Sequence, residues 1–150
     1  MNWIFVINKR IRYKGNKKEN DIHEGLTISV GGKFEIGESP EDCVIREVKE
    51  ETNLDIIKPK LRGIITFPNF DGNKDWYTYV FTAKDYTGNL TKDCNEGDLV
   101  WIKKNEIQNI KTWEGDYIFL DWLVQDKPFF SAKFNYKDNK FIDYEVTFYD

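Results

Sequence analysis

The stretch Gly32–Leu54 reads GKFEIGESPEDCVIREVKEETNL and combines a glycine turn, an arginine and a run of glutamates in a loop followed by a helix. Ser39 is a favourable N-cap, and Pro40 suits the first helical position, where its missing N–H costs nothing. Glu41 and Asp42 place negative charge at the positive end of the helix dipole. The sequence therefore predicts a helix that begins near residue 39.

The predicted helix has two chemically different faces. One is an apolar stripe for packing, formed by Val44, Ile45 and Val48. The other face is acidic. It carries three glutamates whose spacing of three and four residues places them together: Glu47, Glu50 and Glu51. Like charges repel, so either water screens this face, as on many charged helices, or a cation lies among the carboxylates. Carboxylate oxygens suit Mg²⁺ or Mn²⁺, hard ions that bind phosphates at their open positions, which favours phosphate chemistry.

The same segment resembles the Nudix box, the signature of a family of hydrolases. In that signature a Gly is followed by five residues and a Glu, then by seven residues and Arg-Glu-apolar-any-Glu-Glu-any-Gly-apolar. The matching positions here are Gly32, Glu38, Arg46, Glu47, Val48, Glu50, Glu51 and Leu54. Only the second Gly differs, because Asn53 stands in its place. Asn tolerates a positive φ nearly as well, so we expect Asn53 to end the helix in the left-handed conformation.

The resemblance implies an α/β fold, specifically an α/β/α sandwich with a mixed sheet, and an enzyme that hydrolyses a nucleotide. It implies that Mg²⁺ or Mn²⁺ is held by the carbonyl of Gly32 and by Glu47, Glu50, Glu51 and Glu96. Glu50, Glu51 or Glu96 is the candidate base for the attacking water, and these alternatives stay open. Arg46 is expected to orient Glu47 through a charge-assisted hydrogen bond in preference to contacting the substrate. Glu38 is expected either to brace the loop or to support the metal ligands through hydrogen bonds, and Lys33 to contact the substrate.

Near its end the chain resembles the MutT-type members of that family that hydrolyse oxidised purine nucleoside triphosphates. Trp113-Glu114-Gly115-Asp116 resembles their Trp-Pro-Asp-Asp segment, and the segment Lys127–Tyr144 resembles their closing hairpin. The likeness makes Trp113 and Asp116 candidate substrate-binding residues, although core packing explains Trp113 equally well. Gly115 stands where those enzymes have the first of two acids, and Ile28 where they have an Asn, so base recognition is expected to differ.

Composition limits the remaining possibilities. The chain has 150 residues and is expected to form one domain over residues 1–150. Its net charge of −4 argues against a surface for nucleic acid but allows a small anionic substrate bridged by a metal. Cys43 and Cys94 are the two cysteines, and neither a signal peptide nor an apolar run of about 18 residues is present. We therefore expect a cytoplasmic protein with free thiols and no membrane partner.

The rest of the chain predicts strands with a few helices. The expected strands are Trp3–Ile7, Leu26–Val30, Asp55–Ile65, Trp76–Ala83, Leu99–Ile102, Phe129–Tyr136 and Phe141–Tyr149. The expected helices are Lys104–Ile110 and Tyr117–Gln125, and the expected turns are at 71–73, 88–89 and 138–139. The basic segment 9–18 is either a solvated loop or one that faces a triphosphate, and His23 receives no role.

Three functions fit these patterns. The first is a metal-dependent pyrophosphohydrolase that converts a nucleoside triphosphate to the monophosphate and pyrophosphate. The second is hydrolysis of a dinucleoside pyrophosphate such as ADP-ribose or a reduced nicotinamide cofactor, which the same fold would permit. The third is a non-catalytic module that senses a nucleotide. Such a module would normally have lost the metal-binding glutamates, and this chain retains them.

Overall fold

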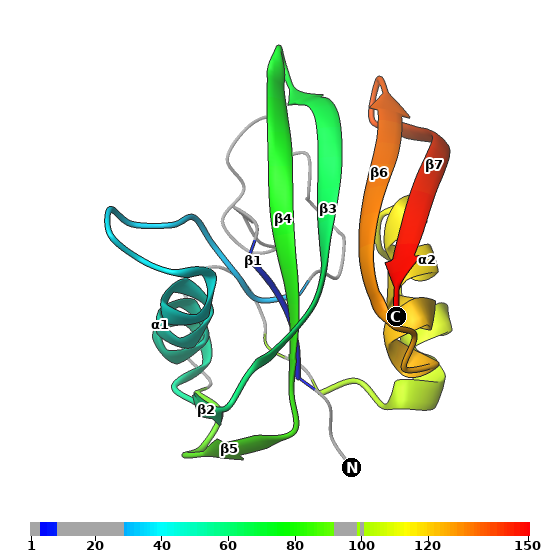
Figure 1. Ribbon diagram of the computed structural model, residues 1–150. Helices are drawn as coiled ribbons and strands as arrows, with labels where there is room; N and C mark the ends of the chain where they lie inside the picture. Colours follow the sequence, from blue (N-terminus) through cyan, green and yellow to red (C-terminus); the bar gives the residue numbers. More distant parts are fainter. Residues whose placement is uncertain (1–3, 9–28, 92–98, 100) are drawn as a thin grey trace.

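A mixed five-stranded sheet forms the centre of the computed structural model, which describes residues 4–8, 29–91, 99 and 101–150, the first of these ranges by backbone alone (Figure 1). Its elements are β1 (Ile4–Asn8), α1 (Pro40–Thr52), β2 (Asp55–Ile57), β3 (Lys60–Asp71), β4 (Lys74–Ala83), β5 (Asp85–Thr87), the 3₁₀ helix η1 (Lys104–Asn109), α2 (Glu114–Val124), β6 (Phe129–Lys137) and β7 (Lys140–Tyr149). The strand order is β1-β4-β3-β6-β7, and β2 pairs with β5 in a separate small sheet. Only β3 and β6 run parallel among the paired strands described, so the sheet is mixed, as predicted.

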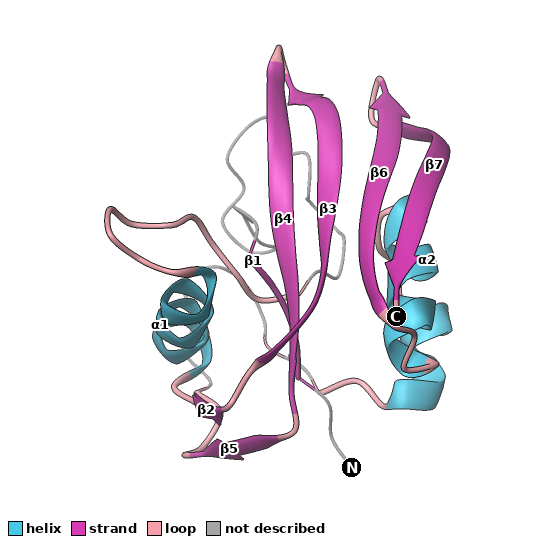
Figure 2. Ribbon diagram, viewed as in Figure 1, coloured by secondary structure: helices cyan, strands magenta, loops and turns pink. Residues whose placement is uncertain are grey.

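The two α-helices cover opposite faces of this sheet (Figure 2). Neighbouring residues of a strand point to opposite faces, and in β4 this places Val80 and Phe81 in different cores. Phe81 is packed with Val44 of α1, whereas Val80 belongs to the core that contains Phe119 and Leu123 of α2. The predicted α/β/α sandwich is therefore confirmed.

Helix α1 begins and ends where the sequence predicts. The Ser39 hydroxyl accepts a hydrogen bond from the Asp42 N–H at 3.1 Å, and the Asp42 carboxylate accepts one from the Ser39 N–H at 3.1 Å. This reciprocal capping box satisfies two N–H groups that have no partner within the helix. Asn53 ends the helix with φ 65°, and its N–H donates to the Lys49 carbonyl.

Two predictions about the surroundings of α1 are wrong. Ile45 does not belong to the buried stripe, because it is 39% exposed and lies about 100° around the helix from Val44. The single strand predicted over Asp55–Ile65 is two strands, β2 and β3, in two different sheets. The chain changes direction between them at Lys58, with φ 48°, and Pro59, which cannot donate a ladder hydrogen bond.

The turn residues locate both long hairpins correctly. Gly72, with φ 64°, lies between β3 and β4, while Asp138 and Asn139 join β6 to β7 with φ 51° and 62°. Two consecutive positive φ angles are typical of a tight hairpin turn whose twist matches the strands. Pro68 lies within β3, where the register shifts between Phe67 and Asp71, instead of in the turn.

Other boundaries differ from the predictions. Helix α2 begins at Glu114, before the predicted Tyr117, and no strand is present at the described residues 99, 101 and 102. Of the strand predicted over Leu26–Val30, only Ser29 and Val30 are described, and Val30 forms a single bridge. None of the described helices is long and apolar enough to cross a membrane.

The C-cap of α1 gives a stability prediction. Asn53→Ala should lower the free energy of unfolding by about 1 kcal/mol, because alanine disfavours the left-handed conformation that the cap requires. Asn53→Gly should stay near the wild-type value, since glycine adopts that conformation freely. Urea unfolding followed by circular dichroism measures both variants. Equal losses would contradict the backbone explanation and point to the Asn53 side chain, which donates to the Asn89 carbonyl at 3.4 Å.

Candidate active site

Arg46 of α1 joins the preceding loop to the acidic face of the helix. Its guanidinium group donates to five oxygen atoms of the loop and the helix: Glu38 Oε1 at 2.5 Å, Glu38 Oε2 at 3.0 Å, Glu47 Oε1 at 2.7 Å, Glu50 Oε2 at 3.1 Å and the Lys33 carbonyl at 3.0 Å. The predicted hydrogen bond to Glu47 is present. Two of the three carboxylates that were expected to repel one another are therefore paired with a cation of the chain itself.

Glu38 braces the loop, which is one of the two roles predicted for it. One of its oxygens also accepts a hydrogen bond from the Glu35 N–H at 2.8 Å, which closes the turn that contains Gly37. The hydrogen bonds from Arg46, and then that from Glu35, lower the pKa of Glu38 to about 2. Glu38 in turn raises the pKa of Arg46 above its usual range, so both groups remain charged at every physiological pH.

Glu51 is the buried member of the acidic face. It is 7% exposed and accepts a hydrogen bond from the Gly31 N–H at 3.1 Å. On the helix it lies beside Val48 and four residues after Glu47, at the edge of the buried stripe, which explains its burial. A carboxylate that is removed from water and held by a backbone N–H has a fixed position before any ligand arrives.

Gly32 allows the loop to lie directly against Glu47. A Cβ placed on Gly32 would lie 2.2 Å from the Glu47 carboxyl carbon, so any side chain there would displace that carboxylate. The Glu47 side chain is only 14% exposed. The backbone of Gly32 therefore approaches the Glu47 carboxylate more closely than any residue with a Cβ would allow.

The donor set fits a hard divalent cation, since it consists of glutamate oxygens beside a glycine backbone with no room for a side chain. Among the described residues, however, no three acidic, histidine or cysteine side chains are gathered closely enough to hold a metal ion. Arg46 engages Glu47 and Glu50, while Glu51 turns towards Gly31. Glu96, the fourth predicted carboxylate ligand, lies outside the described residues, as do His23 and Cys94.

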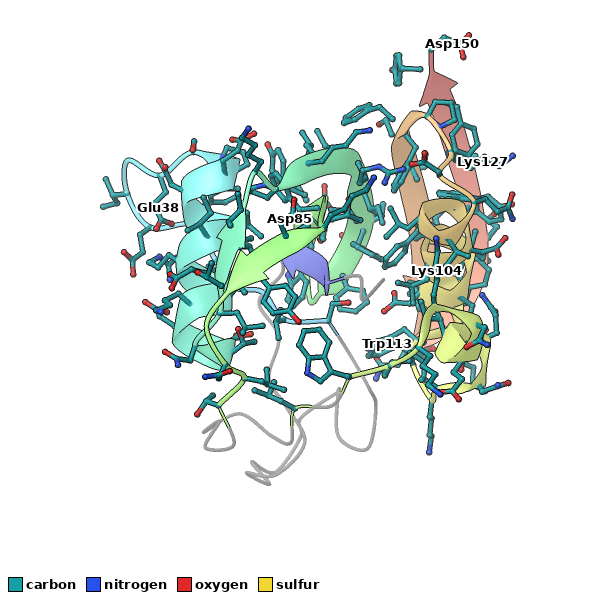
Figure 3. The ribbon with its side chains drawn as sticks, turned by 90° about the horizontal axis from the view of Figure 1, so that it is seen from below. Glu38, Asp85, Lys104, Trp113, Lys127 and Asp150 are labelled. Carbon is teal, nitrogen blue, oxygen red and sulfur yellow. The ribbon has the colours of Figure 1, made fainter. Side chains whose placement is uncertain are left out.

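The predicted substrate-binding residues lie in two places. Lys33 is exposed beside Gly32, and its carbonyl is bound by Arg46. Trp113 lies away from Glu38, across the strands of the sheet (Figure 3), and Asp116 follows it in the first turn of α2. The structure thus does not bring Trp113 and Asp116 together with the glutamates of α1.

Trp113 and Asp116 are both 6% exposed. The Trp113 ring meets Phe70 and Tyr136 edge-on, with centroid distances of 5.5 Å and 5.6 Å. Asp116 accepts a hydrogen bond from the Thr112 hydroxyl at 3.3 Å. Sequence reasoning missed Tyr136, because its contact with this segment spans two elements and only the unusual Gly115 hinted at it.

A family comparison agrees with the loop and helix geometry, because the model of the NUDIX domain matches residues 6–123. The chain belongs to the Nudix family. The Nudix match covers the loop, α1 and most of α2, so the resemblance seen in the Gly32–Leu54 stretch is confirmed. The prediction of a hydrolase acting on nucleotides is confirmed at that level.

Relatives of this Nudix hydrolase have different functional names. The Bacillus subtilis protein named uncharacterized Nudix hydrolase YvcI is 39% identical over 115 residues, covering 75% of this chain and 73% of that protein. The ADP-ribose pyrophosphatase of Methanocaldococcus jannaschii is 26% identical over 71% of this chain and 63% of its own length. The oxidized purine nucleoside triphosphate hydrolase of Mus musculus is 26% identical over 81% of this chain and 76% of its own.

A solved structure supports the same fold. The crystal structure of the MutT protein from Bacillus halodurans superposes with a TM-score of 0.74 and 31% sequence identity, over 79% of this chain and 80% of that one. The mixed sheet between two helices is therefore the MutT type of Nudix fold.

The Glu38–Arg46 pair predicts a pH dependence. A carboxylate with a lowered pKa stabilises the folded state fully above its unfolded pKa, near 4.5, and loses that contribution as the pH falls towards about 2. Wild-type protein should therefore be more stable than Glu38→Gln at pH 7, and the difference should shrink between pH 4.5 and 2. Urea unfolding of both proteins at several pH values measures it. A difference that is independent of pH would contradict an ionic role for Glu38.

Proposed function

We propose that this Nudix hydrolase is a divalent-metal-dependent pyrophosphohydrolase that converts a purine nucleoside triphosphate, normal or oxidised, to the monophosphate and pyrophosphate. The observation that carries the proposal is the closure of the glycine loop on α1. Glu51 is held by the Gly31 N–H, and Glu47 lies against the backbone of Gly32. These contacts position carboxylates at the junction of loop and helix, where a phosphate-bound Mg²⁺ or Mn²⁺ requires oxygen ligands.

In this proposal the residues of the junction bind the metal, orient its ligands and accept the proton of the attacking water. Glu47, Glu50, Glu51 and the Gly32 carbonyl would hold the metal, with Glu96 as a further ligand. The metal would neutralise the phosphate charge and activate the attacking water. Arg46 keeps Glu47 and Glu50 oriented, and Glu38 keeps Arg46 in place. Glu50, Glu51 and Glu96 remain the candidate bases, and Lys33 would contact the phosphates.

The purine preference rests on the second region, at the start of α2. Trp113 and Asp116 offer an aromatic ring and a buried carboxylate, groups that stack on a base and accept its N–H donors. A nucleoside triphosphate has phosphates at one end and a base at the other. The proposal assigns the phosphates to the loop and α1, and the base to the start of α2, two regions that lie apart in the structure (Figure 3). The mouse relative that hydrolyses oxidized purine nucleoside triphosphates supports this choice.

ADP-ribose is the second candidate substrate, because an archaeal relative is named as an ADP-ribose pyrophosphatase. One assay discriminates between the two: purified protein with Mg²⁺ is given normal and oxidised purine triphosphates, pyrimidine triphosphates, ADP-ribose and dinucleoside polyphosphates. Pyrophosphate release from purine triphosphates is expected. Cleavage of ADP-ribose alone would overturn the proposed substrate, and no cleavage of any compound would favour a nucleotide-sensing module.

The proposal also includes the setting of the enzyme. A single domain over residues 1–150 acts in the cytoplasm on a free nucleotide, without nucleic acid or membrane as a partner. The match of the family model to residues 6–123 supports one catalytic unit. The net charge of −4 supports a small substrate in preference to a nucleic acid.

Glu51 gives the sharpest test of the catalytic part. Glu51→Gln should lower kcat by several orders of magnitude while the fold is retained, because glutamine keeps an oxygen that can accept the Gly31 N–H but loses the charge. Glu41→Gln, an exposed change on the same helix, is the matched control and should retain activity. Steady-state pyrophosphate release measures both. Full activity in Glu51→Gln, or in wild-type enzyme with excess EDTA, would exclude this mechanism.

Asp116 tests the proposed base contact. Asp116→Asn should change the ranking of purine triphosphates more than the kcat on the best one, because it exchanges an acceptor for a group that also donates. Trp113→Ala is expected to raise KM by the equivalent of about 1–3 kcal/mol if the ring stacks on the base. Because Trp113 is buried, thermal unfolding must accompany that measurement. Wild-type KM values and ranking in both variants would contradict the assignment.

A further inference from the structure

The hydroxyl group of Tyr136, on β6, reaches the first turn of α2. It accepts a hydrogen bond from the Gly115 N–H at 2.8 Å, although the two residues lie 21 positions apart in the sequence. Gly115 lies directly before Asp116 and two residues after Trp113, the two candidate base contacts. Tyr136 therefore contacts the backbone segment that presents both of them.

Helix α2 relies on this contact because the side chain of its N-cap residue does not cap the first turn. Trp113 occupies the cap position, and an indole cannot accept from the backbone N–H groups of the first turn. The Gly115 N–H is one of the groups that no helical carbonyl reaches. Tyr136 supplies from a neighbouring strand the acceptor that serine or aspartate supplies in an ordinary cap.

Only glycine at position 115 allows this approach. A Cβ placed there would lie 2.6 Å from the Tyr136 hydroxyl oxygen and 2.8 Å from Phe134 Cδ1. Gly115, which stands where the MutT-type segment has its first acid, is thus in direct contact with Tyr136 and Phe134. The Tyr136 hydroxyl takes up the space that a carboxylate side chain at position 115 would need.

The surroundings of Tyr136 favour a neutral, ordered phenol. Burial, and then the negative charge of Asp116, raise the pKa of Tyr136 well above its usual range. The hydroxyl therefore keeps its proton while its oxygen accepts from Gly115. The ring meets Trp113 and Phe70 edge-on, with centroid distances of 5.6 Å and 5.7 Å. Ring and hydroxyl together fix the orientation of the phenol against the start of α2.

From this geometry we infer that Tyr136 is a positioning residue for base recognition: it holds the first turn of α2 through Gly115 and so orients Trp113 and Asp116 towards the purine. The inference rests on the proposed function. It assigns Tyr136 no part in phosphate chemistry, which belongs to the residues of α1.

The first test is Tyr136→Phe, which keeps the ring and removes the hydroxyl. The KM for the preferred purine triphosphate should rise about three- to tenfold, the range expected for one lost hydrogen bond, while kcat changes by less than about twofold. Hydrogen exchange measured by NMR should show faster exchange of the Gly115 amide. An unchanged KM with unchanged exchange, or a fall in kcat at constant KM, would overturn the inference.

Tyr144→Phe is the matched control, because Tyr144 lies on the adjacent strand β7 and packs its ring on Phe134 at 5.5 Å. It should leave both KM and Gly115 exchange at wild-type values; equal effects in the two variants would overturn a specific role for Tyr136. If wild-type enzyme cleaves no purine triphosphate, the proposed function fails by itself. The same comparison is then made with ADP-ribose, which also carries a purine.

A double-mutant cycle tests the pairing itself. Gly115→Ala should raise KM, since its Cβ collides with the Tyr136 hydroxyl. In Gly115→Ala combined with Tyr136→Phe, the rise should be smaller than the product of the two single effects, because the second change removes one of the two colliding groups. Multiplicative effects would show that the residues act independently and would overturn the proposed coupling.

Discussion

The loop and the acidic face of α1 both depend on the hydrogen bonds that the guanidinium group of Arg46 donates. Its positive charge offsets the negative charges of Glu38, Glu47 and Glu50, which it binds together. A planar group with five donors can satisfy several acceptors at fixed angles, which a lysine could not do. The loop carbonyl of Lys33 is one of these acceptors, so the same group fixes backbone and side chains together. Arg46 therefore both balances the charge of the glutamates and holds the shape of the loop before α1.

The sheet then connects two regions that have different tasks. Helix α1 and its loop lie on one face, and α2 lies on the other with β6 and β7 (Figure 2). Strand β3 joins them, because it pairs with β4 on one side and with β6 on the other. Buried Arg62 at the start of β3 strengthens this link by donating to Asp126 at 2.6 Å and to the Lys127 carbonyl at 3.2 Å. The sheet thus sets the position of the carboxylates of α1 relative to Trp113 and the rings around it.

The features that sequence reasoning predicted are those with local causes. The capping box at Ser39, the left-handed Asn53 and the Asp138-Asn139 turn each follow from a few adjacent residues. The division of Asp55–Ile65 into two sheets does not, since it depends on which distant strand pairs with each piece. The partner of the Glu51 carboxylate, the Gly31 N–H, likewise comes from a different segment, and the role of Gly115 depends on Tyr136. Such choices are made by tertiary packing, which no local pattern encodes.

The close approach of Gly115 to Tyr136 also restricts how this region can change over evolutionary time. An acidic side chain at position 115 would begin with a Cβ 2.6 Å from the tyrosine oxygen, so it is incompatible with Tyr136 in its present place. Conversely, losing the hydroxyl while glycine remains leaves a buried N–H without its acceptor. Each single exchange passes through a less stable protein. Residues 115 and 136 are therefore expected to be inherited as a pair.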